Sequence, residues 1–311
     1  MKKEISTIEK LTSHGMRLFY LSIPFLIMVF VFNYLPLYGW VYAFFNYRVG
    51  LNVFTTPFVG LSNFVAPFKN PILLENLGRV MKNTLAVSFL NLSTSFLPVL
   101  FAMLLSEIRS RPYKKIVQTF STMPNFISWV IVYALAYSMF AVDDGFINGL
   151  LMRLGLITEG IQFMRSTGPT IWLIMLGYQI WKSLGWSAII YLAAITSISQ
   201  ELYEAARVDG ANRFQLAAHV TLPGILPTYF VLLVLSIANI ISNGMDQYYV
   251  FSNPINKEYI EVLDLYVYNT GMVSNNIPYA TAVGMMKTVI STFLLFTTNS
   301  LSRLVRGESV I

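Results

Sequence analysis

The chain has 311 residues, of which 55% are hydrophobic and only 12% are charged, and its formal net charge is +6. Soluble proteins carry about 25% charged residues, so this composition argues against a soluble enzyme or a disordered chain and favours a membrane protein. The sequence has no cysteine, which excludes disulfides and thiolate metal sites. Its two histidines, His14 and His219, are too few for a histidine-rich centre. We therefore expect no catalytic residues and no bound metal.

Six stretches are apolar and long enough to cross the hydrocarbon core of a bilayer, which takes about 20 residues. They are predicted at about 18–37, 84–105, 118–140, 170–196, 224–241 and 279–301. Pro124 interrupts the third stretch and Lys182 the fourth, so the ends of these two are approximate. We expect an all-α membrane domain over residues 18–302, with a cytoplasmic segment before it (1–17) and a cytoplasmic tail after it (303–311).

The distribution of Lys and Arg predicts the orientation of these spans. With the N-terminus inside, 12 of the 21 basic residues lie in cytoplasmic parts and seven in external parts, while Lys182 and Lys287 lie within spans. Cytoplasmic loops carry the excess of basic residues in membrane proteins. The pattern therefore predicts that both termini are cytoplasmic, and the net charge gives no support for a nucleic-acid partner.

The sequence lacks the features of a self-powered transporter. No Gly-rich phosphate loop ending in Gly-Lys-Ser/Thr is present. Coupled carriers usually bury carboxylates in their spans, whereas every Asp and Glu here falls in a loop or at a span end. Energy from another subunit is the interpretation that fits, although a stand-alone secondary transporter or channel, or a membrane enzyme acting on lipid-linked sugars, stays open.

The cytoplasmic connection between the fourth and fifth spans predicts two short helices, at 199–208 and 211–219. Gly210 between them permits a sharp turn that other residues resist. Asp209 is a residue type that caps helix N-termini, so we expect it to cap the second helix. Pro223 suits the first turn of the fifth span.

This connection carries a recognisable motif. It reads Glu-Ala-Ala from residue 204 and Asp-Gly-Ala from residue 209, and it ends in Val-Thr-Leu-Pro at Pro223. It resembles the EAA motif of ABC-importer permeases, with Ala217 and Val220 where that pattern usually has Phe and Ile. The resemblance implies a type I ABC-importer permease fold with six transmembrane helices, in which a loop at 199–223 docks onto an ATPase subunit. It implies contact with the ATPase at Glu204, Ala205, Ala206, Asp209 and Gly210.

Other segments extend the resemblance. Residues 58–64, 83–85 and 123–128 are similar to the carbohydrate branch of these permeases, which includes the maltose type. Three C-terminal segments are similar to the LplB-type permeases for polysaccharide or complex oligosaccharide uptake: 266–271, 280–284 and 299–302. A permease for a non-sugar solute is the alternative within the family.

The resemblance also implies partners. The chain is expected to be a non-enzymatic subunit in the bacterial cytoplasmic (inner) membrane, paired with a second permease as a heterodimer. Two ATP-binding subunits would hold ATP and Mg, so this chain binds no cofactor. An extracytoplasmic solute-binding protein would deliver a glycan, and the external loop at 242–278 is long enough to touch it.

Alignment with the maltose-type permease places candidate sugar contacts in three spans. They are Ser121, Asn125, Gln179, Lys182, Ser183, Trp186, Asn239, Ile240 and Asn243. The four in the fourth span follow the spacing i, i+3, i+4 and i+7, so they share one helical face. Alternatively, Trp186 packs against a neighbour or lipid and the asparagines bridge helices. A lysine at mid-span costs about 2.5–3.5 kcal/mol, so Lys182 is expected either to make an interhelical contact or to bind an anionic group of an acidic glycan.

Overall fold

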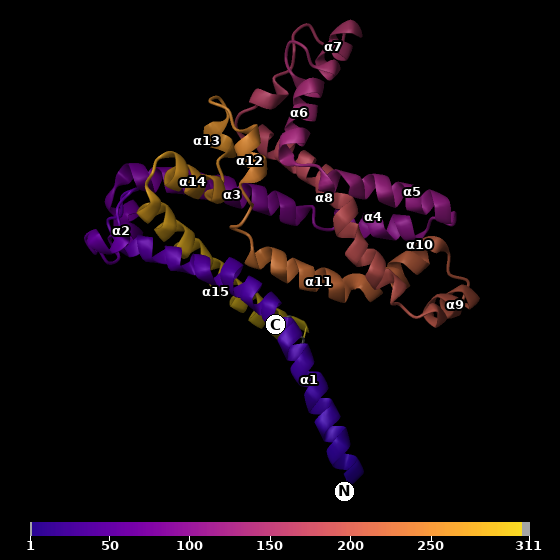
Figure 1. The fold of residues 1–311 in the computed structure, drawn as a ribbon. Helices are drawn as coiled ribbons and strands as arrows, with labels where there is room; N and C mark the ends of the chain where they lie inside the picture. Colours follow the sequence, from indigo (N-terminus) through magenta and orange to yellow (C-terminus); the bar gives the residue numbers. More distant parts are fainter. Residues whose placement is uncertain (1, 307–311) are drawn as a thin grey trace. The chain divides into compact units, whose positions relative to one another are not determined.

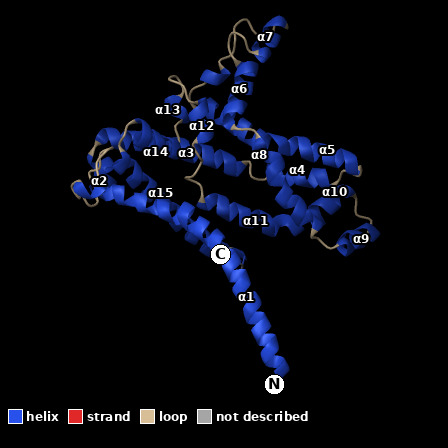
Figure 2. Cartoon of the chain, in the orientation of Figure 1, coloured by secondary structure: helices blue, strands red, loops and turns tan. Residues whose placement is uncertain are grey.

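The computed structural model describes residues 2–306, which are almost entirely helical (Figure 2). Within that range the β-structure is limited to one isolated antiparallel bridge between Phe45 and Phe58. Residue 1 and residues 307–311, which include most of the expected C-terminal tail, lie outside the described part. The prediction of an all-α chain is therefore confirmed for the described residues.

The helices follow one another as shown in Figure 1. The α-helices are α1 (Lys2–Val29), α2 (Ser62–Lys69), α3 (Pro71–Ser93), α4 (Leu97–Ser106), α5 (Arg111–Thr122), α6 (Trp129–Phe140), α7 (Phe146–Arg153), α8 (Pro169–Thr196), α9 (Gln200–Val208), α10 (Arg213–Leu216), α11 (Leu222–Ala238), α12 (Asp246–Phe251), α13 (Lys257–Ile260), α14 (Leu263–Tyr268) and α15 (Ile277–Arg306). π-Helical turns occur at Phe30–Tyr34, Ala217–Thr221 and Asn269–Val273. 3₁₀ turns occur at Leu35–Phe44, Val53–Thr55, Met123–Phe126 and Phe163–Arg165.

Four helical stretches are long and apolar enough to cross a membrane. They are Leu18–Phe44, Pro71–Ser106, Arg213–Ala238 and Ile277–Arg303. A fifth is obtained if Arg111–Phe126 and Trp129–Phe140, which meet at a bend of 104°, count as one broken span. These agree in place with five of the six predicted spans, although the second begins at Pro71 rather than near Thr84.

The predicted fourth span coincides with α8, but its composition differs from that of the others. α8 has 28 residues, which corresponds to about 42 Å of helix at 1.5 Å per residue and exceeds the hydrocarbon thickness. It is not among the stretches that are apolar enough to span, because Gln179, Lys182 and Ser183 lie in its middle. The count of six spans thus stays a prediction.

The chain divides into two compact units. The first consists of Met1–Ala66 and Thr270–Met285, and the second of Pro67–Asn269 and Met286–Ile311. α1 and α15 run through residues 17 and 302 without a break, so neither of the predicted domain ends coincides with the end of a helix.

Within the first unit, the segment 58–64 folds back on the end of the first apolar helix. The amide N–H of Val59 donates to the carbonyl of Phe44 at 2.8 Å. The side chain of Asn63 donates to the carbonyl of Ala43 at 2.9 Å, and the rings of Phe44 and Phe64 lie 5.4 Å apart. The residues that carry the family resemblance here thus close the turn that follows the first span.

Within the second unit, α8 is the central helix. α4 and α5 pack along it (Figure 1), and its buried side chains contribute to two apolar clusters. One cluster joins Met175 to Val87, Val132 and Phe251. The other cluster packs α4 and α11 against α8 and is formed by Val99, Ala102, Leu105, Ala188, Tyr191, Leu192, Ile195 and Ile225.

The loop at 242–278 is less available to a partner than its length suggests. Gln247 in α12 is only 4% exposed and donates to the carbonyl of Met175 at 2.8 Å. Glu261 is only 3% exposed and forms an ion pair with Arg79 of α3 at 2.8 Å. Much of the loop is therefore part of the core, while Asp246 and Glu258 remain exposed.

α5 and α8 approach each other closely at Gly185, which is buried. A Cβ atom at this position would lie 2.2 Å from the carbonyl oxygen of Ser121. No side chain fits there unless the backbones separate, so the contact requires glycine.

We expect Gly185→Ala to lower the melting temperature of the purified protein, because the added methyl group pushes α5 away from α8. Gly177→Ala is the matched control on the same helix, since a Cβ at Gly177 would meet nothing within 4 Å. Alanine is favoured over glycine in a helix by about 1 kcal/mol, so the control is expected to be neutral or stabilising. Equal melting temperatures for the two variants would contradict the close contact.

Candidate functional site

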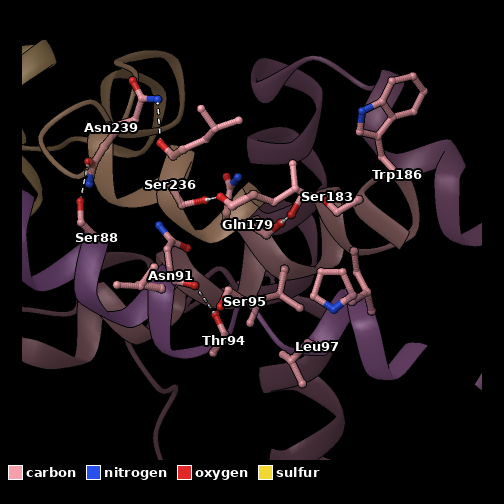
Figure 3. A pocket seen from close by; sticks show the side chains of 18 of the residues that line it. Ser88, Asn91, Thr94, Ser95, Leu97, Gln179, Ser183, Trp186, Ser236 and Asn239 are labelled. Carbon is pink, nitrogen blue, oxygen red and sulfur yellow. Dashed lines mark hydrogen bonds between the residues drawn. The ribbon is translucent and has the colours of Figure 1, made fainter. Parts of the chain in front are cut away.

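A cavity of about 610 Å³ opens among α3, α8 and α11 of the second unit (Figure 3). It lies where α3 ends and α4 begins, and Tyr248 of α12 contributes to its wall. Its polar lining residues are Ser88, Asn91, Thr94, Ser95, Gln179, Ser183, Ser187, Ser236, Asn239, Ser242 and Asn243. Trp186, Tyr191 and Tyr248 supply aromatic surface, and the remaining lining residues are aliphatic or proline.

The wall of the cavity carries hydrogen-bonding groups but no formal charge. None of the described residues that line it is Asp, Glu, Lys, Arg or His. Such a surface offers amides, hydroxyls and aromatic faces, which are the groups that fix the orientation of an uncharged polar ligand in a pocket.

Six of the nine predicted contact residues line this cavity. They are Gln179, Ser183, Trp186, Asn239, Ile240 and Asn243. Ser121, Asn125 and Lys182 are not part of the lining. The hydroxyl of Ser121 donates to the carbonyl of Gln118 in its own helix, and the ammonium of Lys182 donates to three backbone carbonyls near Asn125.

Several lining side chains already have internal partners. The amide of Asn243 accepts a hydrogen bond from Ser88 at 2.8 Å and donates to the carbonyl of Thr84 at 3.2 Å. Asn239 donates to the carbonyl of Leu235 in its own helix. Asn243 therefore bridges the end of α11 to α3, which is the structural alternative considered for the asparagines.

Two amides of the lining have no internal hydrogen bond at all among the described residues. The side chains of Asn91 and Gln179 make no hydrogen bond within the part of the chain that the structure describes, and both border the cavity (Figure 3). Trp186 is 48% exposed and packs edge to face with the ring of Phe126, with centroids 5.6 Å apart. The cavity thus presents an open amide on each of two helices and one aromatic ring.

The sequence did not predict the contribution of α3 and of the turn that follows it. Ser88, Asn91, Thr94 and Ser95 all line the cavity, and none was a candidate. The sequence pattern that could have indicated these residues is the mostly polar segment from Asn91 to Ser95 within an apolar span. In the structure α3 ends at Ser93 within this run, and α4 resumes at Leu97.

The connection at 199–223 forms the predicted pair of short helices, but the residue that caps the second helix differs from the prediction. Gly210 adopts φ of +81°, as the expected sharp turn requires. Asp209 does not cap the second helix. Asn212 does so through a capping box with Gln215, in which each side chain accepts from the backbone of the other at 2.8–3.0 Å. Asp209 instead follows the last residue of α9.

The predicted contact residues of this segment lie largely at the surface. Glu204, Ala205, Asp209 and Gly210 are exposed and Ala206 is half-buried. Two apolar side chains that were not candidates, Val208 and Phe214, are each 87% exposed. Apolar groups this open on a charged connection are typical of a surface that a partner covers.

The second short helix runs directly into the fifth span. Arg213–Ala238 is one helical stretch, with a π-helical turn at Ala217–Thr221. Pro223 follows this turn, and proline cannot donate a backbone hydrogen bond inside a helix. The wider π turn accommodates the proline, so the helix does not have to end.

Comparison with known proteins identifies the family. The family model described as "Binding-protein-dependent transport system inner membrane component" matches residues 94–307. Protein LplB of Bacillus subtilis (strain 168) is 38% identical over 287 residues, which cover 92% of this chain and 88% of LplB. The polygalacturonan/rhamnogalacturonan transport system permease protein YteP of the same organism is 38% identical over 294 residues, covering 94% of this chain and 89% of YteP.

A solved structure agrees with these relatives. A chain of a bacterial ABC transporter involved in the import of the acidic polysaccharide alginate is 33% identical, with a TM-score of 0.83, and the match covers 96% of this chain and 99% of that one. The resemblance inferred from the EAA motif and the flanking segments is confirmed. The chain belongs to the family of binding-protein-dependent transport system inner membrane components, the membrane-embedded permeases of ABC importers.

Proposed function

We propose that this chain is the permease subunit of an ATP-driven importer for oligosaccharides or polysaccharide fragments and forms half of the translocation pathway. The observation that carries the proposal is the uncharged, amide- and aromatic-lined cavity among α3, α8 and α11. Sugars present many hydroxyls and flat C–H faces, which suit amides and an indole ring respectively. Transporter sites of this kind lie among the spans.

The relatives support a glycan as the substrate. One is described as a permease for polygalacturonan and rhamnogalacturonan, and the solved transporter imports alginate. Because the cavity wall of this chain holds no charged side chain, we propose that it binds hydroxyls and sugar rings. Recognition of any carboxylates on an acidic glycan would then fall to the second permease or to the solute-binding protein.

The topology that we propose has six spans over residues 18–302 and both termini in the cytoplasm. α8 supplies the span that hydropathy alone does not identify, since its polar residues face either the cavity or other helices. Gln179 and Ser183 line the cavity, and the amine of Lys182 is satisfied by backbone carbonyls. None of these three side chains therefore needs to be solvated by lipid.

The partners that we propose are a second permease, two ATP-binding subunits that carry ATP and Mg, and an extracytoplasmic solute-binding protein. A solved alginate transporter has been obtained in complex with a periplasmic protein that holds an alginate pentasaccharide. In this chain the ATP-binding subunit would cover the connection at 199–223. Val208 and Phe214 supply exposed apolar surface there, and Glu204 and Asp209 supply charge.

Reconstitution tests the proposal directly. The complete complex in liposomes, with its solute-binding protein, is expected to take up pectin- or alginate-type oligosaccharides only when ATP is supplied. The purified chain alone is expected to transport nothing. Uptake by the chain alone, without ATP, would instead identify a secondary transporter, and uptake of amino acids or peptides by the complex would exclude the glycan substrate.

The open amides give a prediction within the cavity. We expect Asn91→Ala and Gln179→Ala each to raise the half-saturating glycan concentration about 2- to 10-fold, because a hydrogen bond contributes roughly 0.5–1.5 kcal/mol. Ser236→Ala is the matched control, since this lining hydroxyl already bonds the carbonyl of Leu232 in its own helix. A shift for Ser236→Ala as large as for the amide variants would argue against selective binding by the amides.

The coupling surface gives another prediction. Val208→Asp is expected to uncouple the complex, so that transport and substrate-stimulated ATP hydrolysis fall together while the melting temperature of the chain is unchanged. Val208 is 87% exposed in this chain alone, so the loss of transport and ATPase stimulation would result from weaker docking and not from misfolding. Leu202→Asp places the same charge on another face of α9 and is expected to have a smaller effect. Full ATPase stimulation in Val208→Asp would contradict the assignment.

A further inference from the structure

The third apolar segment of the chain is broken between α5 and α6. After α5 the chain forms a 3₁₀ turn that ends at Phe126. The backbone of Ile127 and Ser128 is extended, and α6 begins at Trp129 after a bend of 104°. A helix that stops leaves carbonyl groups without partners. Within lipid each unsatisfied group is costly, so a break inside a membrane-spanning segment requires a donor from elsewhere.

Lys182 of α8 supplies the donors. Its Nζ atom lies 3.2 Å from the carbonyl oxygen of Pro124, 2.7 Å from that of Asn125 and 2.6 Å from that of Ile127. An ammonium group has three N–H donors, and each is matched by one carbonyl. The amine also lies 5.5 Å from the centre of the Trp129 ring, within the range of a cation–π contact.

The other side of the break is capped as well. The hydroxyl of Ser128 accepts from the backbone N–H of Ile131 at 3.4 Å, in the first turn of α6. The carbonyl end of the break is therefore satisfied by a cation from α8, and the N–H end by a neighbouring hydroxyl. The bend is a built feature of the structure.

We propose that the carbonyls of Pro124, Asn125 and Ile127 form an ammonium-binding site whose resident ligand is the side chain of Lys182, and that this contact positions the adjoining wall of the cavity. Phe126 lies inside the segment that the ammonium holds, and its ring packs against Trp186 one turn beyond Lys182. Loss of the ammonium frees this segment and removes the support of the indole ring. Lys182 is thus a positioning residue.

This inference goes beyond the proposed function and requires no particular substrate. It also decides between the two roles considered for Lys182. Because all three donors are occupied and the residue does not line the cavity, no N–H remains for a glycan carboxylate. The charge is needed because hydrogen bonds from an ionised donor are about twice as strong as neutral ones.

The absence of cysteine in the chain allows a selective test in the assembled complex. Lys182→Cys is expected to lower the melting temperature and to reduce transport about tenfold or more. Alkylation with 2-bromoethylamine then creates a side chain of nearly lysine length with a terminal ammonium, and it is expected to restore both quantities. Alkylation with iodoacetamide adds a neutral amide and is expected to restore neither.

Two controls accompany this experiment. The unsubstituted complex is treated with both reagents, which measures any effect on cysteines of the partner subunits. Gly185→Ala is treated in the same way, because it lowers stability by crowding α5 against α8 and offers no thiol, and it should gain nothing from either reagent. The melting temperature needs no substrate, so this test is decided even if the proposed glycan is not transported.

Three results would overturn the proposal. The first is a Lys182→Cys complex as stable and active as the unsubstituted one, and the second is equal restoration by the charged and the neutral reagent. The third concerns the case in which the cysteine variant does not assemble, and variants with Arg or Met at position 182 are then compared. Assembly yields are expected to fall in the order Lys, Arg, Met. A Met variant that assembles as well as the Arg variant contradicts the need for a cation.

Discussion

A polar passage through lipid is possible only if each buried polar group has a partner inside the protein, and this constraint organises the second unit of the chain. Lys182 and Asn243 lie among apolar helices and donate to the backbone carbonyls of Asn125 and Thr84, and Ser88 donates to the carboxamide of Asn243. The same hydrogen bonds that remove the cost of burial hold together the helices that surround the cavity. Stability and the shape of the pathway therefore depend on one set of contacts.

The constraint also separates binding groups from structural ones. The amide of Asn243, which bonds both Ser88 and Thr84, has less capacity left for a ligand although it lines the cavity. Asn239 uses one N–H within its own helix and keeps its carbonyl oxygen and second N–H. Asn91 and Gln179 have no partner among the described residues and are available. Facing the cavity is thus not sufficient for a role in recognition. The hydrogen bonds that each amide already makes within the protein also matter.

The sequence predicted the features that local chemistry determines. Gly210 at a turn with positive φ, the bounds of α8 and the family of the chain followed from residue type, length and motif. It did not predict features that depend on a distant partner. The three carbonyls that hold Lys182 lie more than 50 residues away in the chain. The cap at Asn212 is a different case, because its partner Gln215 is local and the capping-box spacing was present in the sequence.

The continuity of Arg213–Ala238 has a mechanical consequence. A flexible loop would absorb a displacement at the exposed ring of Phe214, whereas a hydrogen-bonded helix transmits it along its axis. This helix ends one residue before Asn239, at the wall of the cavity. Its regular hydrogen bonding is interrupted at the π-helical turn at Ala217–Thr221, close to Phe214, and again at Pro227 inside α11. Under the proposed function, this helix would link the surface proposed for the ATP-binding subunit to the wall of the cavity.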